Sequence, residues 1–309
     1  MPELPDLELY RSALGERLPG RRLERLRLIS PFVLRTVAPP PAALAGRRFV
    51  AIERLGKRFV FVFEDELFAV VHLMIAGRFR WLAGGAKGVG RIGLAAFELA
   101  EAALWLTEAS KKKRASIHLV AGRAGLAEHD PGGIEPLAAG PAALRAALER
   151  ENRTLKRALT DPRLVAGIGN AYSDEILWTA RLSPFTRTAT LGDAEWLRLQ
   201  GAVHEVLAGW TAKLAAEAGG GFPERVTAFR PGMAVHGRFG APCPRCGEAV
   251  QRIVYAENEA NYCARCQTGG RLLADRALSR LMHEDWPRTL EELEEAKAVA
   301  RRRGESDAP

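Results

Sequence analysis

The four cysteines of the chain are the residues whose spacing points most clearly to chemistry. They form two Cys-x2-Cys pairs between Cys243 and Cys266, with 16 residues separating Cys246 from Cys263. This spacing is typical of a structural zinc site, in which four thiolates complete a tetrahedron and leave no position open for catalysis. We predict one structural Zn²⁺ per chain, joining the strands VQRIVYA and ANYC into a hairpin. The alternative is a set of reduced cysteines without a metal.

The N-terminal sequence Met1-Pro2-Glu3 can supply a nucleophile. Removal of Met1 would leave Pro2 with a free secondary amine. An α-amino group has a pKa of about 8, against about 10.4 for lysine, so a useful fraction is unprotonated at neutral pH. Attack of this amine on a sugar C1′ would give an iminium ion, an electron sink, and Glu3 can move protons to the opening ring. The alternative is an ordinary N-terminus without chemistry.

Other residues fit contacts with an anionic partner. Lys57 lies in the turn signal LGKR, a basic run covers Lys111 to Arg114, and the glycine-bearing turn GIGN ends at Asn170 before an expected helix. Backbone N–H groups at a helix start form an anion site. The alternatives are a solvated turn at Lys57, a solvated loop at the basic run and a plain helix N-cap at Asn170.

The elements that must position these residues change in character along the chain. Residues 47–82 and 92–108 carry β-branched and aromatic runs broken by turn signals, which predict strands, and residues 117–122 could pair with 92–108. One helix is expected over 7–18. After the turn HDPGG at 129–133, helical spacing covers 141–161, 171–180 and 193–217. The stretch 219–223 (GGGFP) is expected to be a mobile loop or hinge.

The residues after the last cysteine form a tail of 41 residues. In it, RTLEELEEAKAVARRR begins with a capping box from Thr289 to Glu292 and runs from an acidic first turn to a basic last turn. This order favours a helix. The simplest interpretation is a solvated surface element.

Composition narrows the class of protein. The chain has 309 residues, 47% hydrophobic and 27% charged, which fits a folded globular protein of two or three domains. Its formal charge of +8, carried mostly by arginine, favours an anionic partner. The few, clustered cysteines exclude a secreted disulfide framework. No apolar run is long enough to span a membrane and no secretory signal is present, so we expect a cytoplasmic protein without a membrane partner.

Four motifs, in order along residues 1–268, resemble the formamidopyrimidine-DNA glycosylase and endonuclease VIII family. They are PELPD at the N-terminus, LGKRF around Lys57, VAGIGNAYSDEIL around Asn170 and HGRFGAPCPRCG leading into the cysteine hairpin. The resemblance implies an α+β multidomain fold: an N-terminal β-sandwich (1–132), a helical helix-two-turn-helix domain (133–232), a C-terminal four-cysteine zinc-finger hairpin (233–268) and a partly helical extension (269–309). It also implies that damaged DNA is bound between the domains.

The resemblance implies roles for single residues. Pro2 matches the family's Schiff-base nucleophile, Glu3 its catalytic carboxylate, and Lys57 a lysine used in phosphate binding and proton transfer. Asn170 matches a residue that holds backbone phosphate. Glu175 matches an acidic residue of the family motif, although a lone helix glutamate is more often structural. The DNA-binding residues that we expect are Lys57, Ile75, Lys111, Asn170 and Arg238.

The chain departs from the family pattern at three places. The family has a phosphate-gripping arginine twelve residues beyond the second cysteine, where this chain has Asn258, so strand cleavage is expected to stop after the first elimination. Ile75, or Met74 in another register, takes the first of three wedge positions, and KKKRAS replaces the expected Arg-x-Phe pair. Asp6 replaces a glutamate, a milder change.

These observations predict a monomeric DNA repair glycosylase with abasic-site lyase activity, associated with the nucleoid. Its expected substrates are oxidised or ring-opened bases in single-stranded or distorted DNA, because the wedge that fills the gap left by a flipped base is incomplete. One alternative is a non-catalytic binding protein of the same fold that recognises damaged or branched DNA. Another is an unrelated zinc-ribbon protein that binds RNA.

Overall fold

The computed structural model describes residues 1–84, 88–224, 226–227, 229–255, 258–273, 287–296 and 298. Their contacts divide the chain into two compact units, which are described separately. The first comprises Met1–Ala147, Asp161–Gly169 and Leu207–Ala228, and the second comprises Leu148–Thr160, Asn170–Val206 and Phe229–Pro309. This division cuts the chain differently from the four predicted domains, whose limits stay a prediction.

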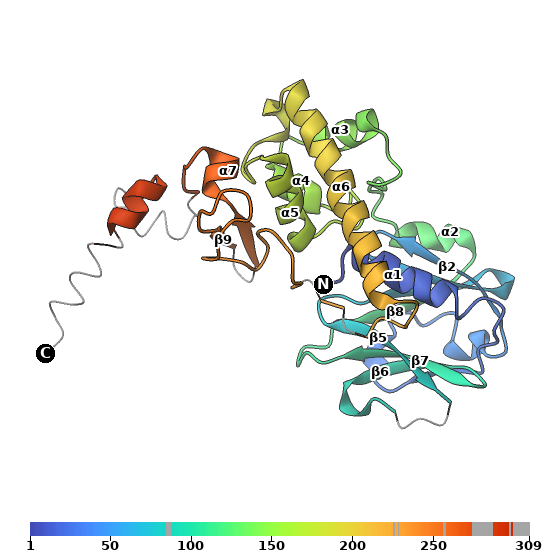
Figure 1. Cartoon of the computed structure of the whole chain (residues 1–309). Coiled ribbons are helices and arrows are strands. Elements are labelled where there is room, and N and C mark those ends of the chain that lie inside the picture. Colours follow the sequence, from blue (N-terminus) through green and yellow to red (C-terminus); the bar gives the residue numbers. More distant parts are fainter. Residues whose placement is uncertain are drawn as a thin grey trace, which may run out of the picture. The chain divides into compact units, whose positions relative to one another are not determined.

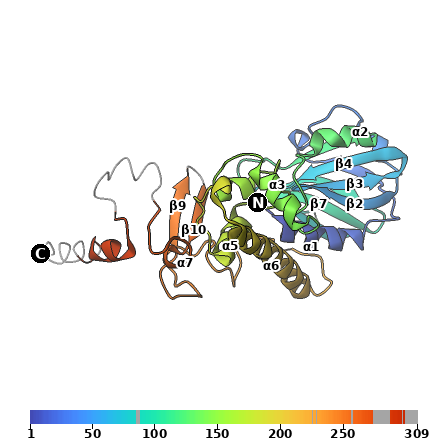
Figure 2. The same cartoon turned by 90° about the horizontal axis from the view of Figure 1, so that it is seen from above.

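Two antiparallel four-stranded sheets dominate the first unit (Figure 1), with strand orders β1-β6-β7-β5 and β2-β3-β4-β8. Strands β2, β3 and β4 lie side by side in Figure 2. The predicted strands within 47–82 and 92–108 are therefore confirmed. The strands are β1 Arg25–Leu28, β2 Phe49–Leu55, β3 Arg58–Phe63, β4 Leu67–His72, β5 Gly77–Ala83, β6 Gly93–Glu98, β7 Ala102–Glu108 and β8 Ser116–Ala121.

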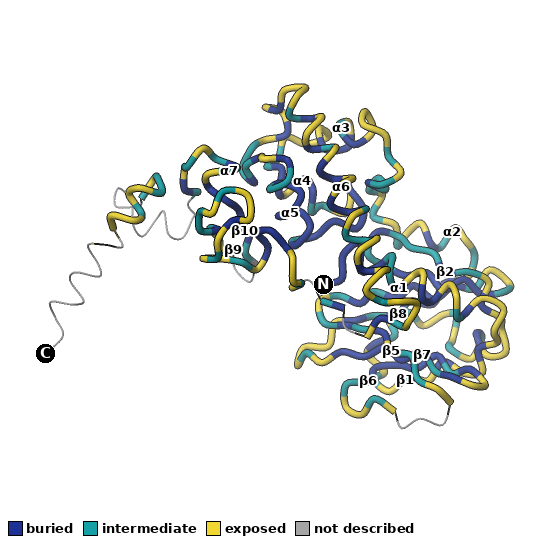
Figure 3. Tube along the Cα trace, in the orientation of Figure 1, coloured by how far each residue is buried: buried dark blue, intermediate teal, exposed yellow. Residues whose placement is uncertain are grey.

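The core of the first unit explains why the sequence of β3, RFVFVF, is apolar at five consecutive positions. On one face of β3, Phe61 packs edge-on against Phe97 of the other sheet, with ring centroids 5.0 Å apart. On the other face, Val60 and Val62 pack with Leu126 of the short helix α2 (Arg123–Leu126). A strand covered on both faces has no polar side to present to water. Figure 3 shows buried residues along the strands of this unit, with exposed residues mainly in the loops between them.

The expected pairing of residues 117–122 with 92–108 is wrong. Strand β8 instead pairs with β4, with Ile117 opposite Val71 and Leu119 opposite Ala69. Strand β7 already has β5 and β6 on its two sides, so no edge remains for β8. The chain therefore crosses from one sheet to the other between β7 and β8.

The first helix begins earlier than the sequence predicts. Helix α1 spans Leu4–Gly15 rather than 7–18. Pro5 lies in its first turn, where the fixed φ of proline suits a helix and no N–H is lost, and the backbone N–H of Glu3 donates to Asp6 Oδ2 at 3.0 Å. The apolar residues that suggested a longer helix are still buried, since Leu18 lies in the core beyond the helix end.

Helices dominate the second unit, which also contains a small hairpin. The remaining helices are α3 Pro141–Glu149, α4 Leu155–Thr160, α5 Asn170–Ala180, α6 Asp193–Ala218 and α7 Ala264–Thr268, and the hairpin consists of β9 Gln251–Tyr255 and β10 Asn258–Tyr262. Helices α3 and α6 have residues in both units. In the part of the chain that the structure describes, no helix is both long and apolar enough to cross a membrane.

The C-terminal extension is helical from Leu290 through its described residues. Thr289 Oγ1 accepts the backbone N–H of Glu292 at 3.2 Å, which is one half of the predicted capping box, while the Glu292 carboxylate accepts the backbone N–H of Arg288. Leu290 and Leu293 pack against the zinc-finger hairpin, so this helix is more than a solvated surface element. The rest of the predicted tail helix lies outside the described residues.

Candidate functional site

The carboxylate of Glu3 is the best-defined element of the candidate catalytic site. Glu3 caps α1 and is only 3% exposed. Its Oε2 accepts the backbone N–H of Gly169 at 2.7 Å, and the next residue, Leu4, donates its N–H to the carbonyl of Gly167 at 2.9 Å. The N-terminus and the glycine turn, far apart in sequence, are thus held together within the first unit.

The ammonium of Lys57 lies beside Gly169, the residue that binds the Glu3 carboxylate. Lys57 follows Gly56, whose φ of +57° allows the tight turn between β2 and β3. A Cβ built on Gly169 would lie 2.5 Å from Glu3 Oε1 and 2.6 Å from Lys57 Nζ. The carboxylate and the ammonium therefore both contact Gly169, where only a glycine fits. The structure brings together Glu3 and Lys57, as the sequence predicted, but the contribution of Gly169 could not be read from the sequence.

The N-terminal amine lies in a partly buried, charged environment. Pro2 is buried. Burial lowers the pKa of the Met1 amine, the N-terminus of the unprocessed chain, below its usual value, and Arg78 and Lys57 lower it further, while Glu3 and Asp6 oppose the shift. An amine in this setting is unprotonated over a wider pH range than a free one.

Two loops of the first unit carry the predicted wedge positions. Ile75, in the turn between β4 and β5, is 56% exposed, and Met74 before it has a φ of +52°. Lys111 is exposed in the loop between β7 and β8. At the base of that loop the buried carboxylate of Glu108 accepts the backbone N–H groups of Arg114 and Ala115 at 2.8 and 3.0 Å. The loop is thus anchored, and it presents lysines instead of a ring.

Asn170 lies in the second unit, at the first position of α5. Its side-chain amide donates to the carbonyl of Glu259 in β10 at 2.6 Å, so Asn170 connects the helix start to the zinc-finger hairpin. The ammonium of Lys156 donates to the carbonyl of Asn170 at 2.7 Å. This use of the amide differs from the plain N-cap that the sequence left open, and a phosphate contact from Asn170 stays a prediction.

A buried polar network beside Asn170 was missed by the sequence analysis. Asp174 accepts from Lys156 through one oxygen and contacts His236 Nδ1 through the other at 2.8 Å. Glu175 accepts three backbone N–H groups, those of residues 234–236, which confirms its structural role. Burial raises the pKa of Glu175, and these three donors oppose that shift. Nothing in the spacing of Lys156, Asp174 and His236 predicts that they meet.

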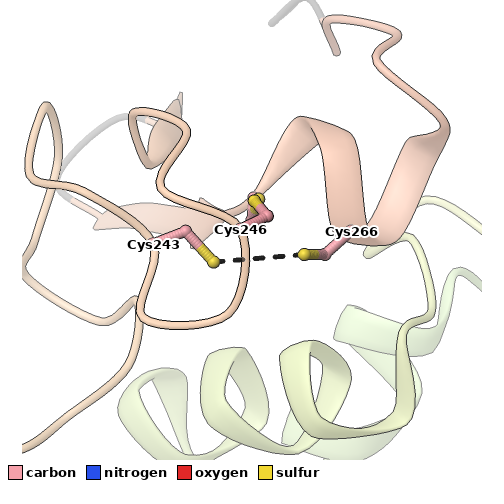
Figure 4. A group of neighbouring side chains, drawn as sticks. Cys243, Cys246 and Cys266 are labelled. Carbon is pink, nitrogen blue, oxygen red and sulfur yellow. Dashed lines mark hydrogen bonds between the residues drawn. The ribbon is translucent and has the colours of Figure 1, made fainter.

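The four cysteines form the metal centre that their spacing predicts. Their sulfur atoms all lie within 4.8 Å of one another. Cys243 and Cys266 point toward each other with Sγ atoms 4.0 Å apart (Figure 4), and those of Cys246 and Cys263 are 3.4 Å apart. Four thiolates at this separation fit a tetrahedral Zn²⁺ and fill all four of its coordination positions. The indole N–H of Trp178 donates to Cys243 Sγ at 3.3 Å.

Arg238 lies between the polar network and the metal centre in sequence. Its guanidinium donates to the carbonyls of Met233 at 3.0 Å and Pro242 at 3.3 Å. The residue thus holds the segment that leads into the zinc finger. A DNA contact from Arg238 stays a prediction.

Loss of one zinc ligand should unfold the finger alone. A Cys263→Ala variant is expected to lose its zinc, because three ligands hold the ion far more weakly than four, and the hairpin is too small to fold without it. Elemental analysis should find about one zinc per wild-type chain and about none in the variant. Arg265→Ala is the matched control, since Arg265 lies between two ligands but its side chain is 64% exposed. A wild-type protein without zinc, prepared without chelator, would contradict this assignment.

Three family models match successive segments of the chain. The formamidopyrimidine-DNA glycosylase N-terminal domain matches residues 1–131, the H2TH domain of the same enzymes matches 133–218, and a zinc finger found in FPG and IleRS matches 240–269. The formamidopyrimidine-DNA glycosylase of Thermus thermophilus is 34% identical over 304 residues, covering 87% of this chain and 100% of that protein.

Solved structures agree. The crystal structure of the MutM (Fpg) protein from Thermus thermophilus superimposes with a TM-score of 0.70 at 31% identity, covering 86% of this chain and 98% of that one. Lactococcus lactis Fpg in complex with DNA containing an abasic site superimposes with a TM-score of 0.75 at 25% identity, covering 86% and 99%.

The N-terminal β-sheet domain, the helix-two-turn-helix domain and the four-cysteine zinc finger together define a DNA glycosylase fold. The chain belongs to the formamidopyrimidine-DNA glycosylase family. The expected family, fold class and structural zinc are therefore confirmed.

Proposed function

We propose that this glycosylase excises oxidised or ring-opened bases from DNA and then cleaves the abasic site through a Schiff base on Pro2. The observation that carries the proposal is the buried Glu3 carboxylate, which lies with Lys57 Nζ around Gly169 and directly follows Pro2 in the chain. A binding protein does not need a buried carboxylate and an ammonium gathered beside the residue that would supply the amine. The Lactococcus lactis relative, which binds abasic-site DNA, supports DNA as the partner.

The chemistry assigned to these groups proceeds through the free amine of Pro2 after removal of Met1. The amine attacks C1′ of the damaged nucleotide, the N-glycosidic bond breaks and the base leaves with a proton. Cleavage of the C1′–O4′ bond then gives an iminium ion, and O4′ receives a proton for which Glu3 is the donor. Loss of a C2′ proton expels the 3′ phosphate. We assign Lys57 to neutralise that phosphate and to assist proton transfer.

DNA is expected to contact the chain mainly through its phosphates. We assign Lys57, Lys111, Asn170 and Arg238 to this binding, and Ile75 to the gap left by the flipped base. Since Asn258, which begins β10, replaces the family's arginine, strand cleavage should stop after the first elimination. A monomeric state and a location at the nucleoid stay predictions.

The wedge loops favour DNA that is already open. Extracting a base from a duplex costs a few kcal/mol of unstacking, which an inserted wedge partly offsets. Ile75 is exposed and apolar, but the loop at Lys111 offers charge without a ring. We therefore propose a preference for lesions in single strands, bubbles and mismatches, with weak action on 8-oxoguanine paired with cytosine.

Single-turnover excision of one oxidised pyrimidine in single-stranded, bubble and fully paired DNA tests this preference. Rates on single-stranded and bubble DNA should exceed the duplex rate by about tenfold or more, the equivalent of about one to two kcal/mol of unstacking. Faster excision from the paired duplex would refute it and would assign the wedge role to Lys112 or Arg114. Binding of all three substrates without excision of any would favour the non-catalytic alternative.

A further inference from the structure

One guanidinium connects the Ile75 turn to a second loop of the first unit. Arg78 follows the turn in β5 and donates to three carbonyls: to Ile75 at 3.2 Å, to Gly77 at 2.6 Å and to Val226 at 2.5 Å. The first two belong to the turn that carries the exposed Ile75 side chain. The third belongs to the segment that follows α6.

The segment after α6 comprises residues 219–227 in its described part, and its first five residues, 219–223, were expected to form a mobile loop or hinge. The structure instead anchors it at three places, to α1, to the residues just after α1 and to β5. Arg17 donates to the carbonyl of Gly220 at 2.9 Å, and the ring of Phe222 lies 5.8 Å from that of Tyr10. Val226 is 4% exposed and belongs to the core, so the carbonyl that Arg78 binds is fixed in place.

The turn that carries Ile75 has a strained backbone, so it needs the Arg78 contacts to keep its shape. Met74 adopts a left-handed φ of +52°, a conformation that side chains other than glycine, asparagine and aspartate rarely take. Gly77 has no room for a Cβ, which would clash with the carbonyl of Leu73. A strained turn needs surrounding contacts to maintain it. The planar guanidinium supplies three donors at once, whereas an ammonium at the end of a flexible stem does not hold the same geometry.

We propose that Arg78 is a positioning residue that fixes the Ile75 side chain against the anchored 219–227 loop and thereby sets how well the enzyme extracts a base from paired DNA. The inference rests on the proposed function, because it assigns Ile75 to the wedge. It goes further by naming the group that holds the wedge. Arg78 acts through Ile75 and does not touch the reacting atoms in this assignment.

The charge of Arg78 has a second, separable effect. Burial lowers the pKa of the Met1 amine most, the charges of Arg78 and Lys57 lower it further, and those of Glu3 and Asp6 raise it. We extend the effect of Arg78 to the Pro2 amine, which is one residue further along the chain and is freed when Met1 is removed. A positive neighbour disfavours the protonated amine, so removing Arg78 should raise the pKa of the amine. Schiff-base formation would then be slower near neutral pH and unchanged at alkaline pH, where the amine is unprotonated in either protein. Arg78→Lys keeps the charge and should keep the pH profile.

The experiment compares Arg78→Ala, Arg78→Lys and Ile75→Ala, with Arg80→Ala as the control from the exposed part of the same strand. Both Arg78 variants should lower duplex excision by about tenfold, as expected when a positioning contact is lost, and leave single-strand excision at about pH 9 within about twofold. Only Arg78→Ala should shift the pH profile. At about pH 9 the double variant Ile75→Ala, Arg78→Ala should be no slower on duplex DNA than either single variant, since the two residues act as one unit.

Each outcome decides the inference. At about pH 9, additive losses in the double variant, or an equal loss of single-strand and duplex excision, would show that Arg78 does not act through the wedge. Thermal melting of each variant checks folding, and if Arg78→Ala fails to fold, Arg78→Lys and its double variant with Ile75→Ala carry the same test. Failure of the proposed function can be told apart from failure of this inference, because the wild type itself would then give no excision and no covalent complex with abasic DNA.

Discussion

A Glu3→Gln variant should lose base excision by about two to four orders of magnitude, the usual contribution of a general acid or base. The glutamine keeps the size of the side chain and an oxygen that can accept the Gly169 N–H, which the native carboxylate binds at 2.7 Å. It cannot give or take a proton. Because the iminium ion can form more easily on a ready-made abasic site, where no base must leave, cleavage of such a site should fall much less.

Single-turnover rates on a damaged base and on a preformed abasic site measure the two effects separately. Glu16→Gln is the matched control, because Glu16 caps the other end of α1 and its side chain is 63% exposed. Glu16→Gln should leave both rates unchanged. Equal small losses for Glu3→Gln on both substrates would mean that the buried carboxylate is structural.

A Gly169→Ala variant should lose activity by about a hundredfold or more, since a displacement of about 1 Å at the reacting groups costs that much. The added methyl would lie 2.5 Å from the Glu3 carboxylate and 2.6 Å from Lys57 Nζ, closer than real Cβ atoms come to other atoms. One or both of these groups must move, and the N–H that orients Glu3 moves with the backbone. The fold should survive, because the conflict is confined to two side-chain ends.

Gly201→Ala is the control for this substitution. Gly201 lies in α6, where a Cβ meets nothing within 4 Å, so alanine there should stabilise the protein by about 0.4–1 kcal/mol and leave excision unchanged. Both variants are compared in thermal melting and in single-turnover excision. Full activity in Gly169→Ala would mean that Glu3 and Lys57 need not lie where the structure has them.

The strands and the metal centre could be predicted because their signals are local. Apolar runs between turn residues indicate strands wherever the sheet lies, and two Cys-x2-Cys pairs define their own ligand set. The partner of β8 could not be predicted, because pairing with β4 or with β7 depends on which sheet the crossing strand joins. The start of α1 at Leu4 was missed because Pro5 suggests an interruption, although proline suits the first turn.

The candidate site was only partly predictable. The chemistry open to Pro2 and Glu3 follows from their residue types, but the assignment of Pro2, Glu3 and Lys57 to one catalytic site came from the family resemblance and not from spacing. The contacts that orient them involve backbone atoms, such as the Gly169 N–H, and backbone atoms leave no mark in composition or periodicity. The same holds for Arg78, whose partners are three carbonyls, and for the network of Lys156, Asp174 and His236, which joins three separate segments.

Borohydride trapping on DNA that carries an abasic site tests the central claim most directly. Reduction of the iminium ion leaves a stable amine bond, so a covalent protein–DNA complex reports a Schiff base. Protein with a free Pro2 N-terminus should trap efficiently, while protein that retains a residue before Pro2, and so has an amide in place of the amine, should give almost no complex. Full trapping by the blocked protein would contradict the account and make Lys57 the first candidate for the attacking amine.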